Sequence, residues 1–232
     1  FYTIIGYEVV TAPDNFFYTH AYTMQYGEPF THTGLLGTYA FDDNWTLSAG
    51  AVTGSATGGW DGNFNTQLSN WDFLGGVTWT SDDKDYSLNL SSTAGPRSAN
   101  ASTAWAMYSL VGKANFLDST LHYVFQHDHG FADDVVTGNG LANFNAGLAP
   151  NGQQNATWYG INQYLTYDVM DNLGVGVRAE WFRDNNGFRI WGPGRCGASI
   201  NVDNGVGVPY ACNQANMNSY PWAGADYYAL TA

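Results

Sequence analysis

The amino-acid sequence predicts an all-β chain, and more specifically part of a transmembrane, up-and-down antiparallel β-barrel. Apolar and polar residues alternate with a period of two along most of the chain, whereas helical periodicity is almost absent. The alternating runs are mostly longer than the ~5–6 residues of an ordinary globular strand. Short and long connections follow one another in strict alternation between these runs.

The expected strands follow one another along the whole chain. They are 30–41, 45–54, 70–80, 86–93, 105–116, 119–129, 156–169 and 172–184, with a last one starting near residue 226 and two further candidates at 1–11 and 16–27. A tilted strand needs ~9–11 residues to cross a bilayer, and these lengths suit that task. No linker divides the runs, so residues 1–232 are expected to form a single barrel domain. Because strand-like sequence reaches both ends of the chain, we expect it to be the middle part of a longer barrel, truncated at both ends.

The connections between the strands are of two kinds. The short ones, at 42–44, 81–85, 117–119 and 170–172, each contain aspartate, whose side chain can bond its own backbone and favour a turn. The long ones, at 55–69, 94–104, 130–155 and 185–225, are rich in Gly, Asn, Ser and Ala. Short turns at one end and long loops at the other are typical of outer-membrane barrels.

One phase of the alternation carries nearly all the charge of the strands. The exceptions are Arg183 and Asp184, beside the last long connection. A charge that faces hydrocarbon at mid-depth costs ~2–4 kcal/mol, so the polar phase is expected to face a water-filled lumen. A water-facing sheet of a soluble protein would alternate in the same way. The pore-lining candidates, read either as selectivity groups or as an ordinary hydrated wall, are Asp72, Lys113, His122, Gln126, Asp128, Asn162, Arg178 and Glu180.

Large aromatic residues mark both ends of the strands. Trp71, Trp105, Trp158 and Trp181 lie beside long connections, and Phe41, Trp45, Trp79, Tyr86, Phe116 and Tyr167 lie beside short turns. Two such rows match the aromatic girdles that anchor a barrel at the two membrane interfaces. A soluble core would place its largest rings near the middle of the strands.

Composition and motifs exclude several classes of function. The chain has 7 Lys+Arg against 20 Asp+Glu, a net charge of -13, which cannot supply the basic surface that nucleic acids require. No nucleophile elbow, phosphate loop or zincin helix occurs, so we expect neither an enzyme nor a cofactor. His122, His127, Asp128 and His129 lie close together in the sequence, but His127 and Asp128 would face opposite sides of a strand. No metal site is therefore expected.

The two cysteines, Cys196 and Cys212, both lie in the long connection 185–225. Their setting predicts a disulfide that staples this loop in an oxidising compartment, and two free thiols are the alternative. Because loops of this length are usually functional or disordered, 185–225 is a candidate for a constriction or a surface lid.

Several stretches resemble the putative beta-barrel porin-2, OmpL-like family of outer-membrane proteins. They are GYEVVTAPDNFFYTHAYTMQYGEPFTHTGLLGTYAF (6–41), NWDFLGGVTWT (70–80), YSLVGKANFLDSTLHYVFQHDHG (108–130) and WYGINQYLTYDVMDNLGVGVRAEWFRDNNGFR (158–189). The resemblance implies a bacterial outer-membrane location, contact with outer-membrane lipid and no catalytic residues. It leaves open the strand number, the pore width and whether several barrels associate as a homo-oligomer.

These observations favour a passive porin for small hydrophilic solutes or ions. One alternative is a soluble β-rich module that binds a ligand such as a carbohydrate, with its apolar face turned inward. The other is a non-conducting outer-membrane barrel used for adhesion or surface attachment. Solubility without detergent would identify the first alternative, and membrane insertion without conductance would identify the second.

Overall fold

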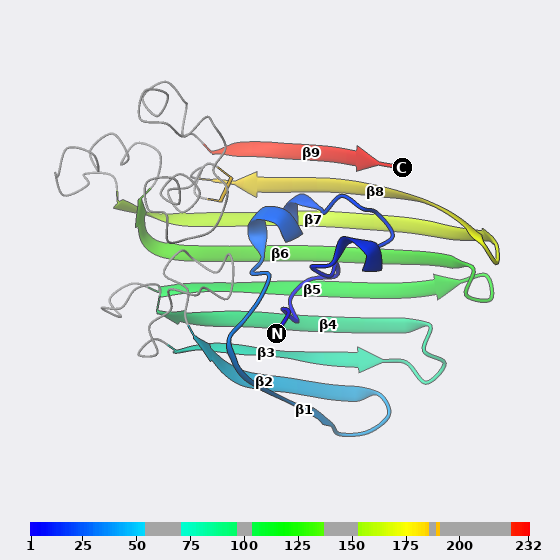
Figure 1. Cartoon of the computed structure of the whole chain (residues 1–232), viewed down its shortest axis with the longest axis horizontal. Coiled ribbons are helices and arrows are strands. Elements are labelled where there is room, and N and C mark those ends of the chain that lie inside the picture. The colour runs from blue at the N-terminus through cyan, green and yellow to red at the C-terminus, as the bar shows by residue number, and fades with distance from the viewer. Residues whose placement is uncertain (54–70, 97–103, 137–152, 186–188, 191–223) are drawn as a thin grey trace.

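The computed structural model describes residues 1–53, 71–96, 104–136, 153–185, 189–190 and 224–232. Within these residues, nine antiparallel strands form one sheet in which each strand pairs with its neighbours in sequence (Figure 1). They are β1 (Gly34–Ala40), β2 (Trp45–Thr53), β3 (Trp71–Thr80), β4 (Tyr86–Pro96), β5 (Ala104–Phe116), β6 (Leu121–Val136), β7 (Gln153–Met170), β8 (Leu173–Asp184) and β9 (Ala225–Thr231). The prediction of an all-β, up-and-down sheet is confirmed. The sheet is not closed, and β1 and β9 form its two edges.

The short connections all lie at one end of the sheet, as the sequence predicts (Figure 1). Aspartate organises the turn between β1 and β2, where Asp42 Oδ1 accepts hydrogen bonds from the backbone N–H groups of Asn44 and Trp45 at 2.9 and 2.8 Å. In the turn between β5 and β6, Leu117, Asp118 and Ser119 have φ angles of 54°, 53° and 60°. This left-handed conformation is costly for a residue with a side chain, and it reverses the chain within very few residues.

Residues 1–33 overturn the prediction of two further strands at 1–11 and 16–27. This segment contains a 3-10 turn, η1 (Ala12–Asp14), a π-helical turn, η2 (Thr23–Gly27), and one isolated bridge between Tyr2 and Thr31. A strand needs a neighbouring backbone for its hydrogen bonds, but parts of this segment bond to side chains of the sheet instead. The backbone N–H groups of Tyr7 and Tyr22, for example, donate to side chains of β6 and β8. Within the described residues, no helix is long and apolar enough to span a membrane.

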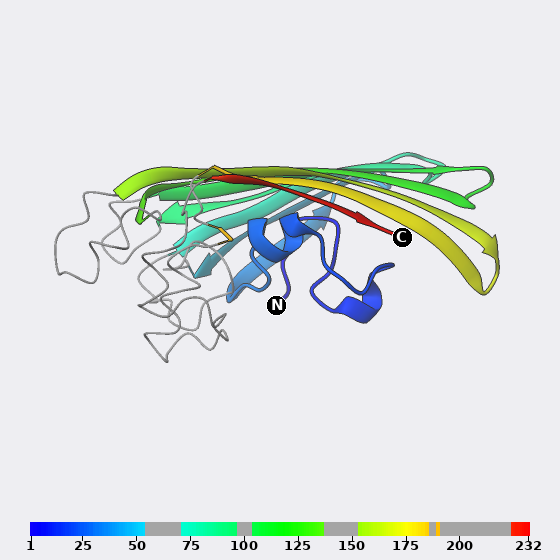
Figure 2. The same cartoon turned by 90° about the horizontal axis from the view of Figure 1, so that it is seen from above.

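The sheet is curved, and segment 1–33 lies on its concave side (Figure 2). The convex face carries large apolar side chains that remain exposed, among them Leu35 at 83% and Leu230 at 75% of their surface. Of the two charges expected outside the polar phase, only Arg183 faces the convex side, where it pairs with Asp226 at 2.9 Å, whereas the expectation for Asp184 is wrong because it shares the phase of Arg178 and Glu180. Asp184, its neighbour, is buried and accepts the backbone N–H of Arg189 at 2.8 Å.

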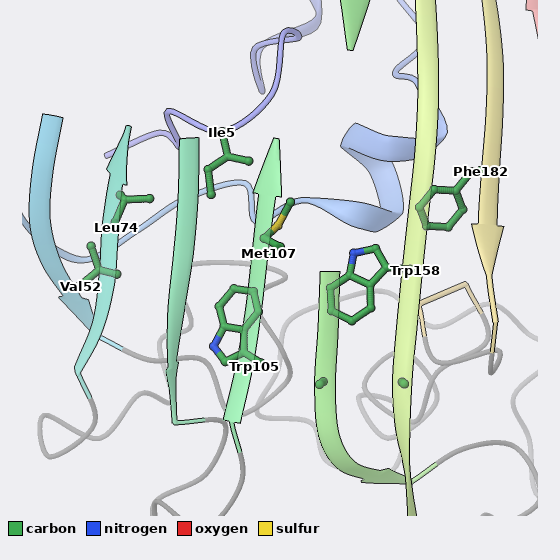
Figure 3. Close-up of a cluster of buried hydrophobic side chains, with 9 residues drawn as sticks. Ile5, Val52, Leu74, Trp105, Met107, Trp158 and Phe182 are labelled. Atoms are coloured by element: carbon green, nitrogen blue, oxygen red, sulfur yellow. The ribbon is translucent and has the colours of Figure 1, made fainter. Parts of the chain in front are cut away.

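The concave face meets segment 1–33 in a buried apolar cluster (Figure 3). Ile5 of the segment belongs to this cluster together with side chains from six strands of the sheet, which are Val52, Leu74, Trp105, Met107, Ala132, Ala156, Trp158 and Phe182. Burying a side chain of this kind contributes ~1.5–3 kcal/mol. The cluster therefore holds the start of the segment against the sheet, independently of its polar contacts.

Candidate functional site

The candidate site is the interface between segment 1–33 and the concave faces of β5 to β9. The segment is anchored here by two buried polar networks, one around Arg178 of β8 and one around Gln126 of β6. Each network joins charged groups of the segment to groups of the sheet. The two networks decide how firmly the segment is held inside the curve.

Arg178 lies at the centre of the first network, and it is buried. Its Nη1 donates to Glu8 Oε1 of the segment at 2.7 Å, and its Nε donates to Glu180 Oε1 of the same strand at 2.8 Å. Its Nη2 donates to Thr19 Oγ1 at 3.1 Å and to Thr231 Oγ1 of β9 at 3.4 Å. One guanidinium therefore joins the segment to two neighbouring strands, which suits the planar, five-donor geometry of arginine.

The two carboxylates around Arg178 are themselves fully bonded. Glu8 also accepts the Tyr164 hydroxyl at 2.9 Å and the Ala21 backbone N–H at 2.9 Å, and Glu180 accepts the Tyr22 N–H at 2.7 Å. A buried ion pair is tolerated when further hydrogen bonds satisfy its remaining lone pairs. Removing one member would leave an uncompensated charge, so the network fixes the position of the segment.

Gln126 lies at the centre of the second network. Its Oε1 accepts the Tyr7 N–H at 3.2 Å, which turns its amide group toward two carboxylates. Its Nε2 donates to Glu28 Oε1 of the segment at 2.6 Å and to both oxygens of Asp128 at 3.0 and 2.9 Å. Glu28 and Asp128 are both fully buried. Burial and the adjacent charge of Asp128 raise the pKa of Glu28 well above its usual value.

Further contacts fix η2 against β7. Asn162 Nδ2 donates to Thr23 Oγ1, and Trp158 Nε1 donates to the Gly27 carbonyl at 3.0 Å. Arg189 lies over the Trp158 ring, with its Cζ 4.6 Å from the ring centroid, and donates to the Tyr26 carbonyl. The segment is therefore held against the sheet at η2 as well as at Glu8 and Glu28.

Gly6 provides a test of how tightly the segment fits. It has a φ of +86°, and a Cβ at this position would lie 2.1 Å from Glu28 Oε2. Gly6→Ala is expected to weaken docking of the segment by about 1–3 kcal/mol, through the left-handed backbone and the displaced carboxylate. The measurement is the rate at which a protease cleaves segment 1–33 in vesicle-embedded protein. Gly37→Ala is the matched control, because the nearest atom to its Cβ is 3.8 Å away; equal cleavage of both variants would contradict a tight fit.

All eight pore-lining candidates have the strand phase of the concave face. Segment 1–33 covers five of them and brings them together, namely Gln126, Asp128, Asn162, Arg178 and Glu180. Asp72 lies apart, where it accepts the Trp105 Nε1–H at 2.9 Å. His122 lies near the short turns, 3.0 Å from Asp168, and Lys113 is exposed. In the part of the chain that the structure describes, segment 1–33 therefore covers most of the concave-face residues that were expected to line the pore.

The aromatic candidates divide between the two faces of the sheet. Eight lie on the convex side or in its turns: Phe41, Trp45, Trp71, Trp79, Tyr86, Phe116, Tyr167 and Trp181. Trp105 and Trp158 are buried on the concave face (Figure 3) and so lie outside the outward-facing rows. Their strand phase already indicates this, because Trp105 lies on the same face of its strand as Ser109 and Lys113, and Trp158 lies on the same face as Asn162. In their place, Tyr108, His129 and Tyr159 continue a convex row toward Trp181, with neighbouring ring centroids 5.5–6.0 Å apart.

Sequence reasoning missed Glu8 and Glu28, the two segment carboxylates that anchor it. A signal was present, because the chain contains only three glutamates and all three lie in these networks. The candidate disulfide of Cys196 and Cys212, and almost all of loop 185–225, lie outside the described residues. Among the described residues, no group of three or more His, Cys, Asp or Glu side chains is placed to hold a metal ion.

Comparison with known proteins agrees with the strand pattern. A family model described as "Putative beta-barrel porin-2, OmpL-like" matches residues 1–232, which is the whole chain. No curated protein and no solved structure matches it.

Proposed function

Because the chain belongs to the putative beta-barrel porin-2, OmpL-like family, we propose that it acts as an outer-membrane porin whose lumen is narrowed by residues 1–33. The pore is a passive channel for small hydrophilic solutes, and its convex face contacts outer-membrane lipid. The polar concave face, with a segment anchored on it by buried charges, supports this proposal most strongly. A segment held by Arg178 and Gln126 resists displacement while water and solutes pass beside it.

The convex face supports the membrane location. Its exposed apolar side chains extend over all nine strands, whereas a soluble monomer rarely exposes a contiguous apolar patch of more than a few hundred Å². Two outward-facing charges, Arg183 and Asp226, lie at the end of the long connections and pair with each other. Such a pair suits the water interface of a membrane better than its centre.

Conductance across a planar bilayer tests the proposal. The full-length protein, extracted in detergent, is expected to insert and to form open channels under an asymmetric salt gradient. Insertion without conductance would favour an adhesion or attachment barrel, and a protein that stays in solution without detergent would favour a soluble binding module. Either result would overturn the porin proposal.

Lys113 is the residue most suited to a selectivity test. Its ammonium group makes no hydrogen bond or ion pair with any described residue, and its Nζ lies 5.0 Å from the centroid of the Tyr7 ring. It borders a cavity of about 220 Å³ between the segment and the sheet, with Tyr7, Phe17 and Tyr164. A cation left unpaired beside the lumen is expected to favour anions near it.

Reversing the charge at this position is expected to shift selectivity. Lys113→Glu should raise the cation-to-anion permeability ratio by about two- to five-fold, because an exposed charge contributes on the order of 0.5–1 kcal/mol. The measurement is the reversal potential under a salt gradient. Lys84→Glu, in a turn at the end of the sheet, is the control. An equal shift in reversal potential in both variants would show that Lys113 does not line the permeation path.

A further inference from the structure

The buried carboxyl pair of Glu28 and Asp128 crosses the boundary between the segment and the sheet. Glu28 directly follows η2 on the segment, and Asp128 belongs to β6. The same Gln126 amide donates to both, at 2.6 Å to Glu28 and at 2.9 and 3.0 Å to Asp128. Any change in the charge of this pair therefore acts directly on the contact that holds the segment.

The surroundings of the pair do not compensate two negative charges. Among the described residues, no Lys or Arg forms an ion pair with either carboxylate. Arg178 is occupied by Glu8 and Glu180, and Glu8 adds a further negative charge near Glu28. Arg189 lies over the Trp158 ring and donates to the Tyr26 carbonyl, two residues before Glu28. The facing groups are neutral, and are Ser109 of β5, Gln126 of β6 and Asn162 of β7.

Among the described residues, the remaining titratable neighbours form no ion pair with either carboxylate. His127 follows Gln126 on β6 but points to the convex face, where its ring lies 5.7 Å from that of Tyr108. His20 of the segment bonds to Glu8 Oε2 at 3.2 Å, so it belongs to the Arg178 network. Lys113 of β5 lies over Tyr7. Two ionised carboxylates that accept from the same amide would repel each other in a medium that screens charge poorly.

We propose that Glu28 and Asp128 hold a single shared proton, and that this proton latches segment 1–33 onto β6. With the proton bound, one carboxyl donates to the other and the pair carries one negative charge. When the proton is released to water, the two carboxylates repel each other, the segment separates from β6 and the lumen widens. The latch rests on the proposed channel function, because its effect on solute flow requires an open pore.

The direction of the pH dependence follows from Glu28. The pKa of this buried carboxyl is raised when the segment is docked, so docking is favoured at low pH and weakens as pH rises through the raised pKa. Conductance is therefore expected to increase with pH. A pore closed by protonation of exposed histidines would give the same direction, so variants of the pair must decide between the two.

Glu28→Gln separates these explanations. Single-channel conductance of the full-length protein in planar bilayers is measured from about pH 5 to about pH 10, a range that brackets a raised carboxyl pKa. The wild type should show a rise in conductance across this range. Glu28→Gln and Asp128→Asn should each hold the low-conductance level throughout, because a pair with one neutral amide cannot become doubly charged. Asp14→Asn, on the same segment but exposed, should keep the wild-type profile.

Two further measurements test the shared proton and the docking of the segment without requiring an open channel. Infrared spectra of the vesicle-embedded wild type should contain a protonated carboxyl band at neutral pH, and this band should be absent from Glu28→Gln. Protease cleavage of segment 1–33 should accelerate with pH in the wild type and not in that variant. A pH-independent wild type with a conducting pore would overturn the latch and leave the porin proposal intact. A missing infrared band would overturn the latch even if no channel forms.

Discussion

Arg178→Met is expected to release segment 1–33 and to raise single-channel conductance several-fold. The substitution leaves Glu8 and Glu180 buried without their counter-charge, and losing one member of such a pair costs about 3–5 kcal/mol. Both carboxylates would gain hydration if the segment moved away from β8. Undocking therefore relieves the penalty while the sheet itself keeps its backbone hydrogen bonds. Planar-bilayer conductance and protease cleavage of the segment measure the two consequences.

Arg183→Met is the matched control, because it removes the same side chain from the same strand. Arg183 pairs with Asp226 on the convex face, where both side chains are partly exposed. An exposed pair contributes ~0–1 kcal/mol, so conductance should stay near the wild-type level. Glu8→Gln provides a second test if Arg178→Met assembles poorly, since it removes one charge and preserves the shape. Unchanged conductance in both Arg178→Met and Glu8→Gln would show that the network does not hold a constriction.

Leu90→Arg is expected to cause the largest loss of barrel stability. Leu90 lies near the middle of β4, is exposed on the convex face and pairs with Val77 and Leu110. An arginine at the bilayer midplane costs about 2–4 kcal/mol in transmembrane barrels. The measurement is the free energy of unfolding from lipid vesicles, followed by tryptophan fluorescence in guanidinium chloride.

Asn89→Arg is the control for that variant, since the adjacent side chain faces the concave side and bonds to Thr78 Oγ1 at 2.7 Å. Its substitution should cost less than that of Leu90, because the new charge has access to water in the lumen. Equal costs at the two positions would contradict a lipid-facing convex surface. A larger cost at Asn89 would indicate the inverted arrangement of a soluble ligand-binding barrel.

The strands and their two faces could be predicted from the sequence because each depends on local rules. Alternation sets which side chains share a face, and residues such as Asp42 form turns from their own side-chain hydrogen bonds. Trp105 and Trp158 lie outside the expected girdles because a position at a strand end does not decide which face a side chain takes. The structure follows phase, and both rings fill the concave face beneath segment 1–33.

The segment itself could not be predicted in the same way. Its sequence alternates enough to resemble strands, yet its backbone bonds to Gln126 and Glu180, which lie 119 and 158 residues away from their partners in the chain. Such contacts depend on where the folded sheet places polar side chains and leave no periodic trace. The constriction that we propose is formed by residues 1–33, whereas almost all of the loop expected to form one, 185–225, lies outside the described residues.

If residues 1–33 narrow a conducting pore, as we propose, then shortening the segment should widen it. Thr3 N–H donates to the Phe30 carbonyl at 3.0 Å, and Tyr2 bridges Thr31, so the two ends of the segment are already adjacent. A two-residue Asn-Gly turn can therefore replace residues 4–29 without disturbing the start of β1. Single-channel conductance of this shortened variant should exceed that of the wild type several-fold, and its pore should admit larger polymers. Equal conductance in the two proteins, or none in either, would contradict the account.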